Sequence, residues 1–142
     1  MTHLIDGDSI ADWLNRQPAV VASLAGLPPD GLAISIISHS EILEGILGAR
    51  DPRTAERAFR GFLQGVRVLP ITRTVSRRHA ILRRELRQRG RQVRERALDL
   101  LIGATALTYD LTLVTSNTRD FQDMPGLKLL NPRTGETRQV PA

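Results

Sequence analysis

Four short segments of this sequence carry an acidic or amide side chain where a strand is expected to end or a helix to begin. They are Asp6 and Asp8, Glu41, Asp99, and the pair Asn117 and Asp120. Carboxylates gathered in one pocket repel one another and raise each other's pKa, so such a pocket needs a cation between them. Oxygen ligands favour Mg²⁺ or Mn²⁺ over Zn²⁺. A divalent ion held there can bind a phosphate oxygen and activate water, which indicates phosphodiester hydrolysis.

Each of these side chains also has an ordinary structural explanation when it is taken alone. Asp8 either caps the helix that follows it or contacts a metal, and both alternatives stay open. Glu41 and Asp99, placed in first helical turns, can simply complement the helix dipole. Asn117 and Asp120 can serve a turn. Asp99 fits this explanation least well, because apolar residues surround it and burying an unpaired charge is costly.

The elements that would position these side chains alternate between short strands and helices. Apolar and β-branched runs predict strands at 4–5, 32–37, 66–71 and 111–115. Helical spacing predicts helices behind Asp8-Ser9, over 19–27, from Ser38 or Ser40 to Gly48, and over 51–65, 74–89 and 97–109. The predicted fold class is α/β with three layers, α/β/α, in which helices flank a central parallel sheet of about four to five short strands. Sites in such sheets form at the carboxyl ends of the strands.

Composition narrows the function classes. The chain has 142 residues, of which 41% are hydrophobic and 25% charged, as expected for one globular domain. It has no cysteine, which excludes disulfides, thiolate zinc sites and thiol nucleophiles. The net charge is +5, and Lys128 is the only lysine among 20 basic residues. This arginine excess suits RNA or an acidic protein segment, although GC-rich coding sequence explains it equally well.

The two ends of the chain carry separate expectations. Residues 1–6 lack the basic region and long apolar run of a signal peptide, and no later apolar run approaches a membrane span, so the cytoplasm is the expected location. We expect one domain over residues 1–132. The segment 133–142 is rich in Pro, Gly, Thr and Arg, and we expect it to be a loose C-terminal tail.

Taken in order, these segments resemble the PIN-domain family, and within it the VapC-type toxins. The resemblance rests on Leu4–Ile10, on Ile34–Gly45, and on the long run from Asp99–Ala106 through Leu113–Phe121 to Pro125–Leu127. It spans residues 1 to about 132. The resemblance implies a PIN-like α/β/α fold.

The resemblance also implies roles for the acidic side chains. Asp6, Glu41 and Asp99 would bind the metal or hold its water, with Asp6 as the central residue. Asn117 would take the loop position among the catalytic residues and bind metal together with Asp6 and Asp99, and Asp120 would support the metal nearby. The chain departs from the family at two points: Gly7 stands where the family often has Thr or Ser, and the amide of Asn117 brings no charge.

The activity that the resemblance implies is that of a Mg²⁺- or Mn²⁺-dependent endoribonuclease, the toxin of a toxin-antitoxin pair. It would hydrolyse RNA phosphodiester bonds with metal-activated water and leave 5′-phosphate and 3′-hydroxyl ends. The implied partners are the RNA substrate, a cognate VapB-type antitoxin whose C-terminal segment occupies the active-site groove, and a second copy in a homodimer. Arginines within 77–96 are candidates for phosphate contacts, or else form a solvated helix face.

Two alternatives remain open at this level. The departures at Gly7 and Asn117 suit a catalytically weak PIN-fold protein that binds RNA or an antitoxin without cutting. The run Asp6-Gly7-Asp8 also resembles the opening of haloacid-dehalogenase-type phosphatases, in which the first aspartate is a nucleophile. Those enzymes need a downstream lysine beside the phosphate, and Lys128 is poorly placed for that.

Overall fold

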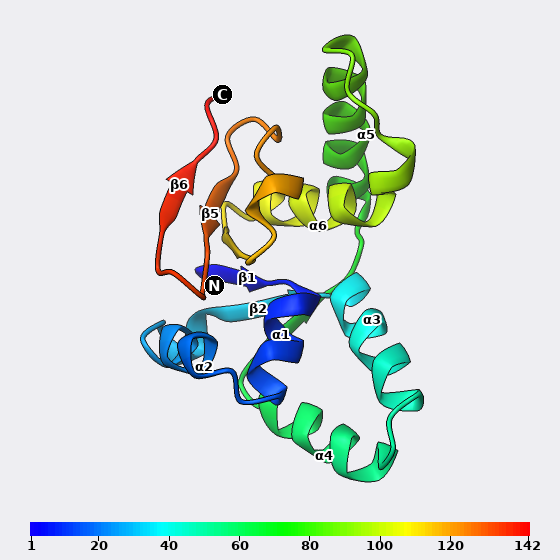
Figure 1. Cartoon of the computed structure of the whole chain (residues 1–142). Coiled ribbons are helices and arrows are strands. Elements are labelled where there is room, and N and C mark those ends of the chain that lie inside the picture. Colours follow the sequence, from blue (N-terminus) through cyan, green and yellow to red (C-terminus); the bar gives the residue numbers. More distant parts are fainter.

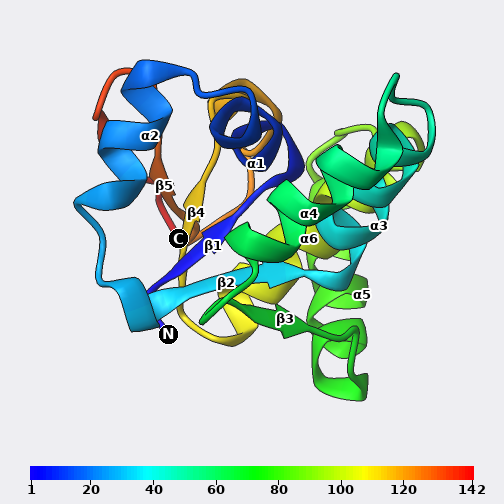
Figure 2. The same ribbon diagram turned by 90° about the horizontal axis from the view of Figure 1, so that it is seen from below.

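The computed structural model describes all 142 residues and contains one sheet of six strands in the order β3-β2-β1-β4-β5-β6 (Figures 1 and 2). Its strands are β1 (His3–Ile5), β2 (Leu32–Ser35), β3 (Arg67–Leu69), β4 (Thr112–Val114), β5 (Lys128–Leu130) and β6 (Thr137–Gln139). The first five run parallel, and β6 pairs antiparallel with β5. The predicted α/β class is confirmed, with a sheet that is mixed and has one strand more than expected.

Helices cover both faces of this sheet and complete three layers. They are α1 (Gly7–Leu14), α2 (Pro18–Ala25), α3 (Ile36–Leu47), α4 (Pro52–Phe62), α5 (Arg73–Gln88) and α6 (Ala97–Thr108). In Figure 1, α1 to α4 lie on one side of the sheet, and α5 and α6 on the other. Successive residues of a strand enter opposite cores: Leu4 joins the α5 and α6 side, and Ile5 the α1 to α4 side.

Helix α3 begins earlier than the sequence indicates. The Ser35 hydroxyl accepts a hydrogen bond from the Ile37 backbone N–H at 3.1 Å, so it is Ser35, rather than Ser38 or Ser40, that caps the helix. Strand β2 therefore ends at Ser35, although Ile36 and Ile37 are β-branched. As a consequence Glu41 lies in the second turn of α3, and the expectation of a first-turn position is wrong.

The expectation of a loose tail after residue 132 is also wrong. The chain turns back through Gly135, which has a φ of +77°, and β6 then pairs with β5. Val140 is buried in the same core as Leu127 and Leu129. Polar composition along 133–142 hid this strand, because an edge strand of three residues is held by its neighbour rather than by its own hydrophobic pattern.

Helix α5 is the longest helix, with 16 residues, and it extends beyond the sheet in Figure 1. It buries Val75, Leu82 and Leu86, of which the two leucines join the core that α6 forms with the sheet, and arginines occupy much of its outer surface. The arginine-loaded helix expected over 74–89 is confirmed. None of the helices combines the length and the apolar character needed to cross a membrane.

Candidate active site

The central strands β1 and β4 create a crevice at the carboxyl edge of the sheet. After β1 the chain enters α1 on one face. After β4 it enters a segment whose Phe121, Met124 and Leu127 pack into the core of the opposite face. Adjacent parallel strands whose following segments leave to opposite faces open a space between them, which is where open α/β sheets place their sites.

A small pocket of about 40 Å³ lies at this point and gathers most of the polar residues singled out in the sequence. It is lined by Asp6, Gly7, Asp8, Glu41, Asp99, Ile102, Asn117 and Phe121. We call it the acidic pocket. The side chains come from the β1 end, α1, α3, α6 and the β4 loop, so the tertiary fold assembles them from across the chain. Asp120 does not line it.

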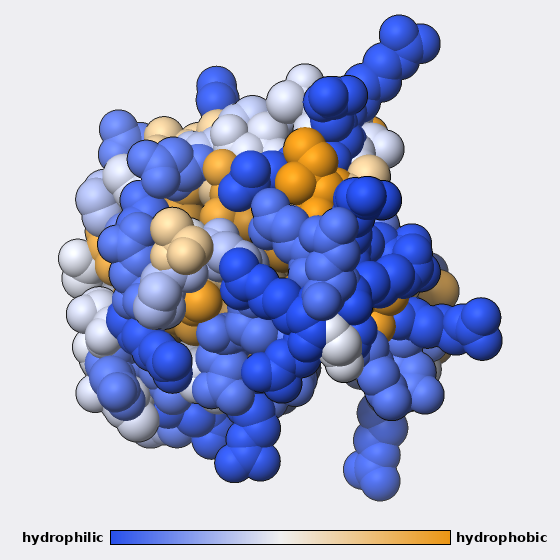
Figure 3. All heavy atoms as spheres, turned by 90° about the horizontal axis from the view of Figure 1, so that it is seen from above, coloured by the Kyte–Doolittle hydropathy of each residue, from blue (hydrophilic) through white to orange (hydrophobic).

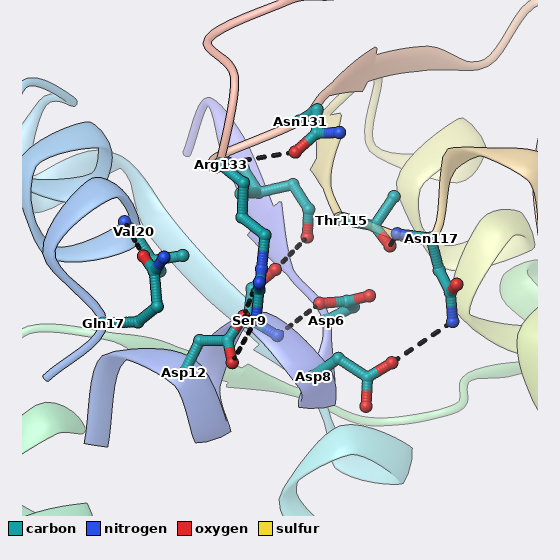
Figure 4. Close-up of polar contacts among 11 residues, drawn as sticks. Asp6, Asp8, Ser9, Asp12, Gln17, Val20, Thr115, Asn117, Asn131 and Arg133 are labelled. Carbon is teal, nitrogen blue, oxygen red and sulfur yellow. Dashed lines mark hydrogen bonds and ion pairs between the residues drawn. The ribbon is translucent and has the colours of Figure 1, made fainter. Parts of the chain in front are cut away.

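Asp6 is the buried acid of this pocket and is 6% exposed. Its carboxylate accepts a hydrogen bond from the Ser9 backbone N–H at 2.8 Å, so Asp6 rather than Asp8 caps α1 (Figure 4). Burial raises the pKa of Asp6 from 3.8 to about 6, although the Thr115 hydroxyl and the hydrogen bonds from Ser9 act against that rise. Asp6 therefore carries its charge at a cost that a nearby cation would relieve.

Asp8 is released from capping and turns toward the β4 loop. The Asn117 side-chain amide donates to its carboxylate at 3.3 Å, a contact between residues 109 positions apart (Figure 4). The Asn117 backbone N–H in turn donates to the Thr115 hydroxyl at 3.0 Å. Sequence reasoning left Asp8 undecided and missed Thr115 altogether. The only signal for Thr115 was its position at the end of a buried strand, directly before the polar loop.

Glu41 and Asp99 complete the negative side of the pocket. Burial raises the pKa of Glu41, and the charges of Asp99, Asp8 and Asp6 raise it further. Burial also raises the pKa of Asp99, together with Asp120 and Asp8, while Arg96 lowers it. Neighbouring carboxylates thus raise the pKa of Asp6, Glu41 and Asp99, as expected for a clustered anionic site.

The donor set fits a hard divalent cation. It consists of carboxylate and amide oxygens, with no sulfur and no histidine among the lining residues. No three acidic or histidine side chains are already arranged to hold one ion together.

Gly7 leaves room beside Glu41. A Cβ at position 7 would lie 3.4 Å from the Glu41 Oε1, so a small side chain there would touch the carboxylate. The hydroxyl that the resemblance to the PIN-domain family implies at this position is absent, and the Glu41 carboxylate borders the pocket.

A wider groove adjoins the acidic pocket and shares Gly7, Asp8 and Glu41 with it. It has a volume of about 640 Å³ and runs between α1, α3 and α4 over an apolar floor. A neighbouring depression of about 760 Å³ continues it along α2 through the shared residues Leu14, Arg16 and Ala58. We call the two together the apolar groove.

Comparison with known proteins gives a consistent family. The family model described as PIN domain matches residues 4–127. The chain is 25% identical to "Ribonuclease VapC1" of Haemophilus influenzae (strain R2866) over 130 residues, which cover 90% of this chain and 96% of that protein. It is 32% identical to "Ribonuclease VapC19" of Mycobacterium tuberculosis (strain ATCC 25618 / H37Rv) over 127 residues, covering 88% and 96%.

Solved structures agree with the sequence comparison. A chain in the crystal structure of VapBC2 from Rickettsia felis, bound to a DNA fragment from their promoter, superimposes with a TM-score of 0.81 at 26% identity. The match covers 92% of this chain and 98% of that one. The family model covers most of the chain, and the relatives and the solved structure agree with it. The chain therefore belongs to the PIN-domain family, in its VapC-type branch.

Proposed function

We propose that this chain is a divalent-metal-dependent endoribonuclease, the toxin of a toxin-antitoxin pair, and that the acidic pocket is its active site. The observation that supports this most is the convergence of four carboxylates and one amide on a single crevice at the carboxyl edge of the sheet. Both relatives described above are named ribonucleases. A phosphodiester is the substrate class that such an anionic, cation-dependent site serves.

In this proposal Asp6, Asp99 and Asn117 bind Mg²⁺ or Mn²⁺, Glu41 acts with them in catalysis, and Asp120 supports the site from outside the pocket. The ion, when bound, supplies positive charge for the scissile phosphate and lowers the pKa of water. Asp6 is held rigidly by its N-cap hydrogen bond, so its carboxylate presents a fixed direction. Glu41 lines the same pocket and is more exposed, and we assign it the role of accepting a proton from the attacking water.

Asp8 and Asn117 hold the two sides of the crevice together through their hydrogen bond. Thr115 and Ser9 direct hydrogen bonds at Asp6 and favour its charged form. These four residues therefore orient the site, and we assign them positioning roles beside any direct contact of Asn117 with the ion.

The phosphatase alternative requires a lysine near Asp6 to balance the phosphate charge, and the fold places none there. Lys128 stands at the start of β5 and forms an ion pair of 3.0 Å with Asp110, which precedes β4. Both residues lie at the amino ends of parallel strands, at the opposite edge of the sheet from Asp6. The acidic pocket therefore has no lysine with which to bind a transferred phosphoryl group.

The test is cleavage of a labelled single-stranded RNA in buffers that contain EDTA, Mg²⁺ or Mn²⁺. We expect cutting only with the metals, and a loss of about a hundredfold or more in Asp6→Asn and Asp99→Asn. Asparagine at position 6 keeps a good N-cap and removes the charge, so the fold is preserved. Asp30→Asn, an exposed change at the far edge of the sheet, is the matched control.

Undiminished cutting in EDTA would refute the metal-dependent mechanism. RNA binding without cutting, in protein saturated with metal, would instead identify the catalytically weak binding protein that the departures at Gly7 and Asn117 suggest.

We further propose that the apolar groove receives the C-terminal segment of a cognate antitoxin of the VapB type. The groove opens onto the acidic pocket, so a peptide lying in it would block Glu41 and Asp8. Ala58 lines both parts of the groove, and Ala58→Glu should abolish capture of the protein encoded in the adjacent reading frame while leaving RNase activity. Ala80→Glu on α5 is the control. Capture that survives Ala58→Glu would refute this site.

A homodimer and a cytoplasmic location complete the proposal. Edge strand β3 has one free side, and Val68 on it and Ile36 beside it are 37% and 39% exposed. Light scattering on the wild type and on Val68→Lys would test whether this edge joins two copies: we expect a dimer that the variant weakens, and a monomeric wild type would contradict it.

A further inference from the structure

A second charged pocket, opposite in sign, lies between the end of α5, the β4–β5 connection and β6. Its volume is about 690 Å³. Five arginines from separate segments line it: Arg89, Arg91, Arg96, Arg119 and Arg138. Against them stand Asp120 and Asp123, which gives a net side-chain charge of +3. We call it the basic pocket.

One arginine of the basic pocket forms an ion pair, and the other four form none. Arg96 holds Asp123 through two hydrogen bonds of 2.6 and 2.8 Å, and it also donates to the Asp120 carbonyl at 2.8 Å. The ion pairs of the structure include none of the other four. The pocket therefore has one wall held by an ion pair, and four exposed guanidinium groups that form none.

The basic pocket and the acidic pocket lie on two sides of one turn. Asn117 and Phe121 line the acidic pocket, whereas Arg119 and Gln122 line the basic one. Asp120 lines the basic pocket and is also close enough to Asp99 to raise its pKa. A strand bound at the acidic pocket thus needs to pass only this turn to reach the free arginines.

We propose that the basic pocket binds the phosphate backbone of the RNA strand next to the cleavage point, an inference that rests on the proposed function. Guanidinium groups bind phosphate oxygens bidentately, and unpaired ones lose no internal ion pair when they do so. Aromatic residues make up 4% of the chain, so contacts to the backbone rather than base stacking must supply most of the affinity.

This inference separates the arginines that the sequence treated as one group. Arg89 and Arg91 lie in the basic pocket, whereas Arg77 and Arg84 lie on the exposed face of α5 and line no part of it. Arg119 and Arg138, which come from outside that run, join the first two. The face of the molecule seen in Figure 3 is largely hydrophilic, with apolar side chains in small separate areas.

An acidic protein segment is the other polyanion that could occupy the basic pocket. Protein partners are anchored by apolar and aromatic side chains that fill apolar hollows. Only three of the 13 lining residues are hydrophobic, including Leu86 and Val140 at its floor. The lining therefore favours a ligand whose contacts are repeated charges, as in a nucleic-acid backbone.

The experiment measures binding of a fluorescein-labelled single-stranded RNA by anisotropy in EDTA, so that cleavage does not interfere. The variant Arg119→Gln/Arg138→Gln is compared with Arg77→Gln/Arg84→Gln, which removes the same charge from the face of α5. We expect the first variant to raise Kd about tenfold at low salt. It should also reduce the slope of log K against log salt by about 0.7 for each phosphate that the protein no longer neutralises. The second variant should change Kd much less.

Equal weakening by the two variants would overturn the inference, because it would mean that net charge alone drives binding. So would unchanged binding by Arg119→Gln/Arg138→Gln, or displacement of the RNA by poly-glutamate at equal charge concentration, which would identify an acidic protein site. Thermal unfolding of each variant confirms that the fold is intact. A wild type that binds but does not cut refutes the endonuclease and leaves the basic pocket standing. A wild type that cuts RNA, together with an unchanged KM in Arg119→Gln/Arg138→Gln, supports the endonuclease and refutes the role of the basic pocket.

Discussion

The acidic and basic pockets are neighbours of opposite net charge, and each holds an excess of one sign. In the acidic pocket neighbouring carboxylates raise the pKa of Asp6, Glu41 and Asp99, and no arginine or lysine lines the pocket. In the basic pocket four arginines have no ion pair. Keeping the two clusters apart costs electrostatic free energy, because pairing their opposite charges would stabilise both clusters. A fold that keeps them apart must gain something else from the arrangement.

Other charges are paired in ways that fix structure, including one pair in the wall of the basic pocket. Arg96 and Asp123 brace the turn between the pockets, and Arg133 holds Asp12 of α1 through bonds of 2.9 to 3.1 Å. These arginines and aspartates form ion pairs at places where a turn or a helix must be held in position. The unpaired clusters are therefore best understood as sites for external ligands of opposite charge.

The largest expected effect is on kcat for RNA cleavage, and it distinguishes a loss of catalysis from a loss of RNA binding. Glu41→Gln should lower kcat for RNA cleavage about a hundredfold or more and leave KM nearly unchanged, because it removes charge from the acidic pocket alone. Arg119→Gln/Arg138→Gln should raise KM and leave kcat nearly unchanged. Glu44→Gln, one turn further along α3 and outside the pocket, is the matched control. A Glu41→Gln protein with normal kcat would break the comparison on its acidic side.

Without metal, the charge of Asp6 in the acidic pocket should make the free energy of unfolding depend on pH. The Asp6 carboxyl has a folded pKa of about 6 against an ordinary value of 3.8, so between these pH values the folded protein binds more protons than the unfolded chain. In EDTA the free energy of unfolding should therefore fall as pH rises from about 4 to about 6, by up to about 3 kcal/mol.

Urea unfolding across this pH range measures the effect. Mg²⁺ at neutral pH should restore part of the loss, and Asp6→Asn should flatten the pH profile. Stability that climbs steadily from pH 4 to 6 in EDTA, with no response to Mg²⁺, would mean that the acidic pocket carries no unfavourable charge.

The paired turn between the pockets should show the opposite pH sign. Burial acts to raise the pKa of Asp123, but the hydrogen bonds and charge of Arg96 outweigh it and hold that pKa below its ordinary value. The stabilisation is therefore present above pH 4 and is lost as pH falls below it. The side chains of Arg96 and Asp123 are 23% and 17% exposed, so Asp123→Asn should cost about 1 to 3 kcal/mol at neutral pH.

A double-mutant cycle with Arg96→Gln measures the coupling in that pair. A coupling near zero would contradict the bracing role, and it would remove the distinction between the paired and the free arginines of the basic pocket.

The smallest effect is expected at the surface pair Arg133 and Asp12. Their side chains are 49% and 21% exposed, so Arg133→Gln should reduce the free energy of unfolding by less than about 1 kcal/mol. Because its geometry is bidentate, this loss should exceed that for the i,i+4 pair of Glu56 and Arg60. The side chains of that pair are 53% and 72% exposed, and breaking it should change the free energy of unfolding by nearly zero. Denaturation midpoints rank the two, and the reverse order would contradict the role of Arg133 in tying the β5–β6 turn to α1.

Sequence patterns predicted the parts of the fold that depend on local chemistry. The helices over 51–65, 74–89 and 97–109 were expected from apolar spacing, and the structure contains α4, α5 and α6 within a few residues of those bounds. β5 and β6 were missed: each has only three residues, β6 is polar throughout, and pairing with a neighbouring strand holds them in the sheet more than their own sequence does. Helix α3 begins earlier than expected, with its cap at Ser35 instead of Ser38 or Ser40, because the serine cap outweighs the β-branched pair after it.

The candidate site shows the same division. Residue types and strand ends predicted oxygen ligands for a cation at the carboxyl edge of the sheet. They did not show that Asp6 caps α1 while Asp8 turns toward Asn117, since that choice depends on a hydrogen bond between residues 109 positions apart. Thr115 was missed for the same reason.

By itself, the sequence determined the alternation of strands and helices, the absence of sulfur ligands and the excess of arginine. These follow from side-chain types and from periodicities that act over one or two turns of chain. Only the tertiary structure decided which acids share a pocket, which acid caps a helix and which arginines remain unpaired. Electrostatic and hydrogen-bond energies depend on distances between residues far apart in the chain, and packing of the sheet and its two helical layers sets those distances.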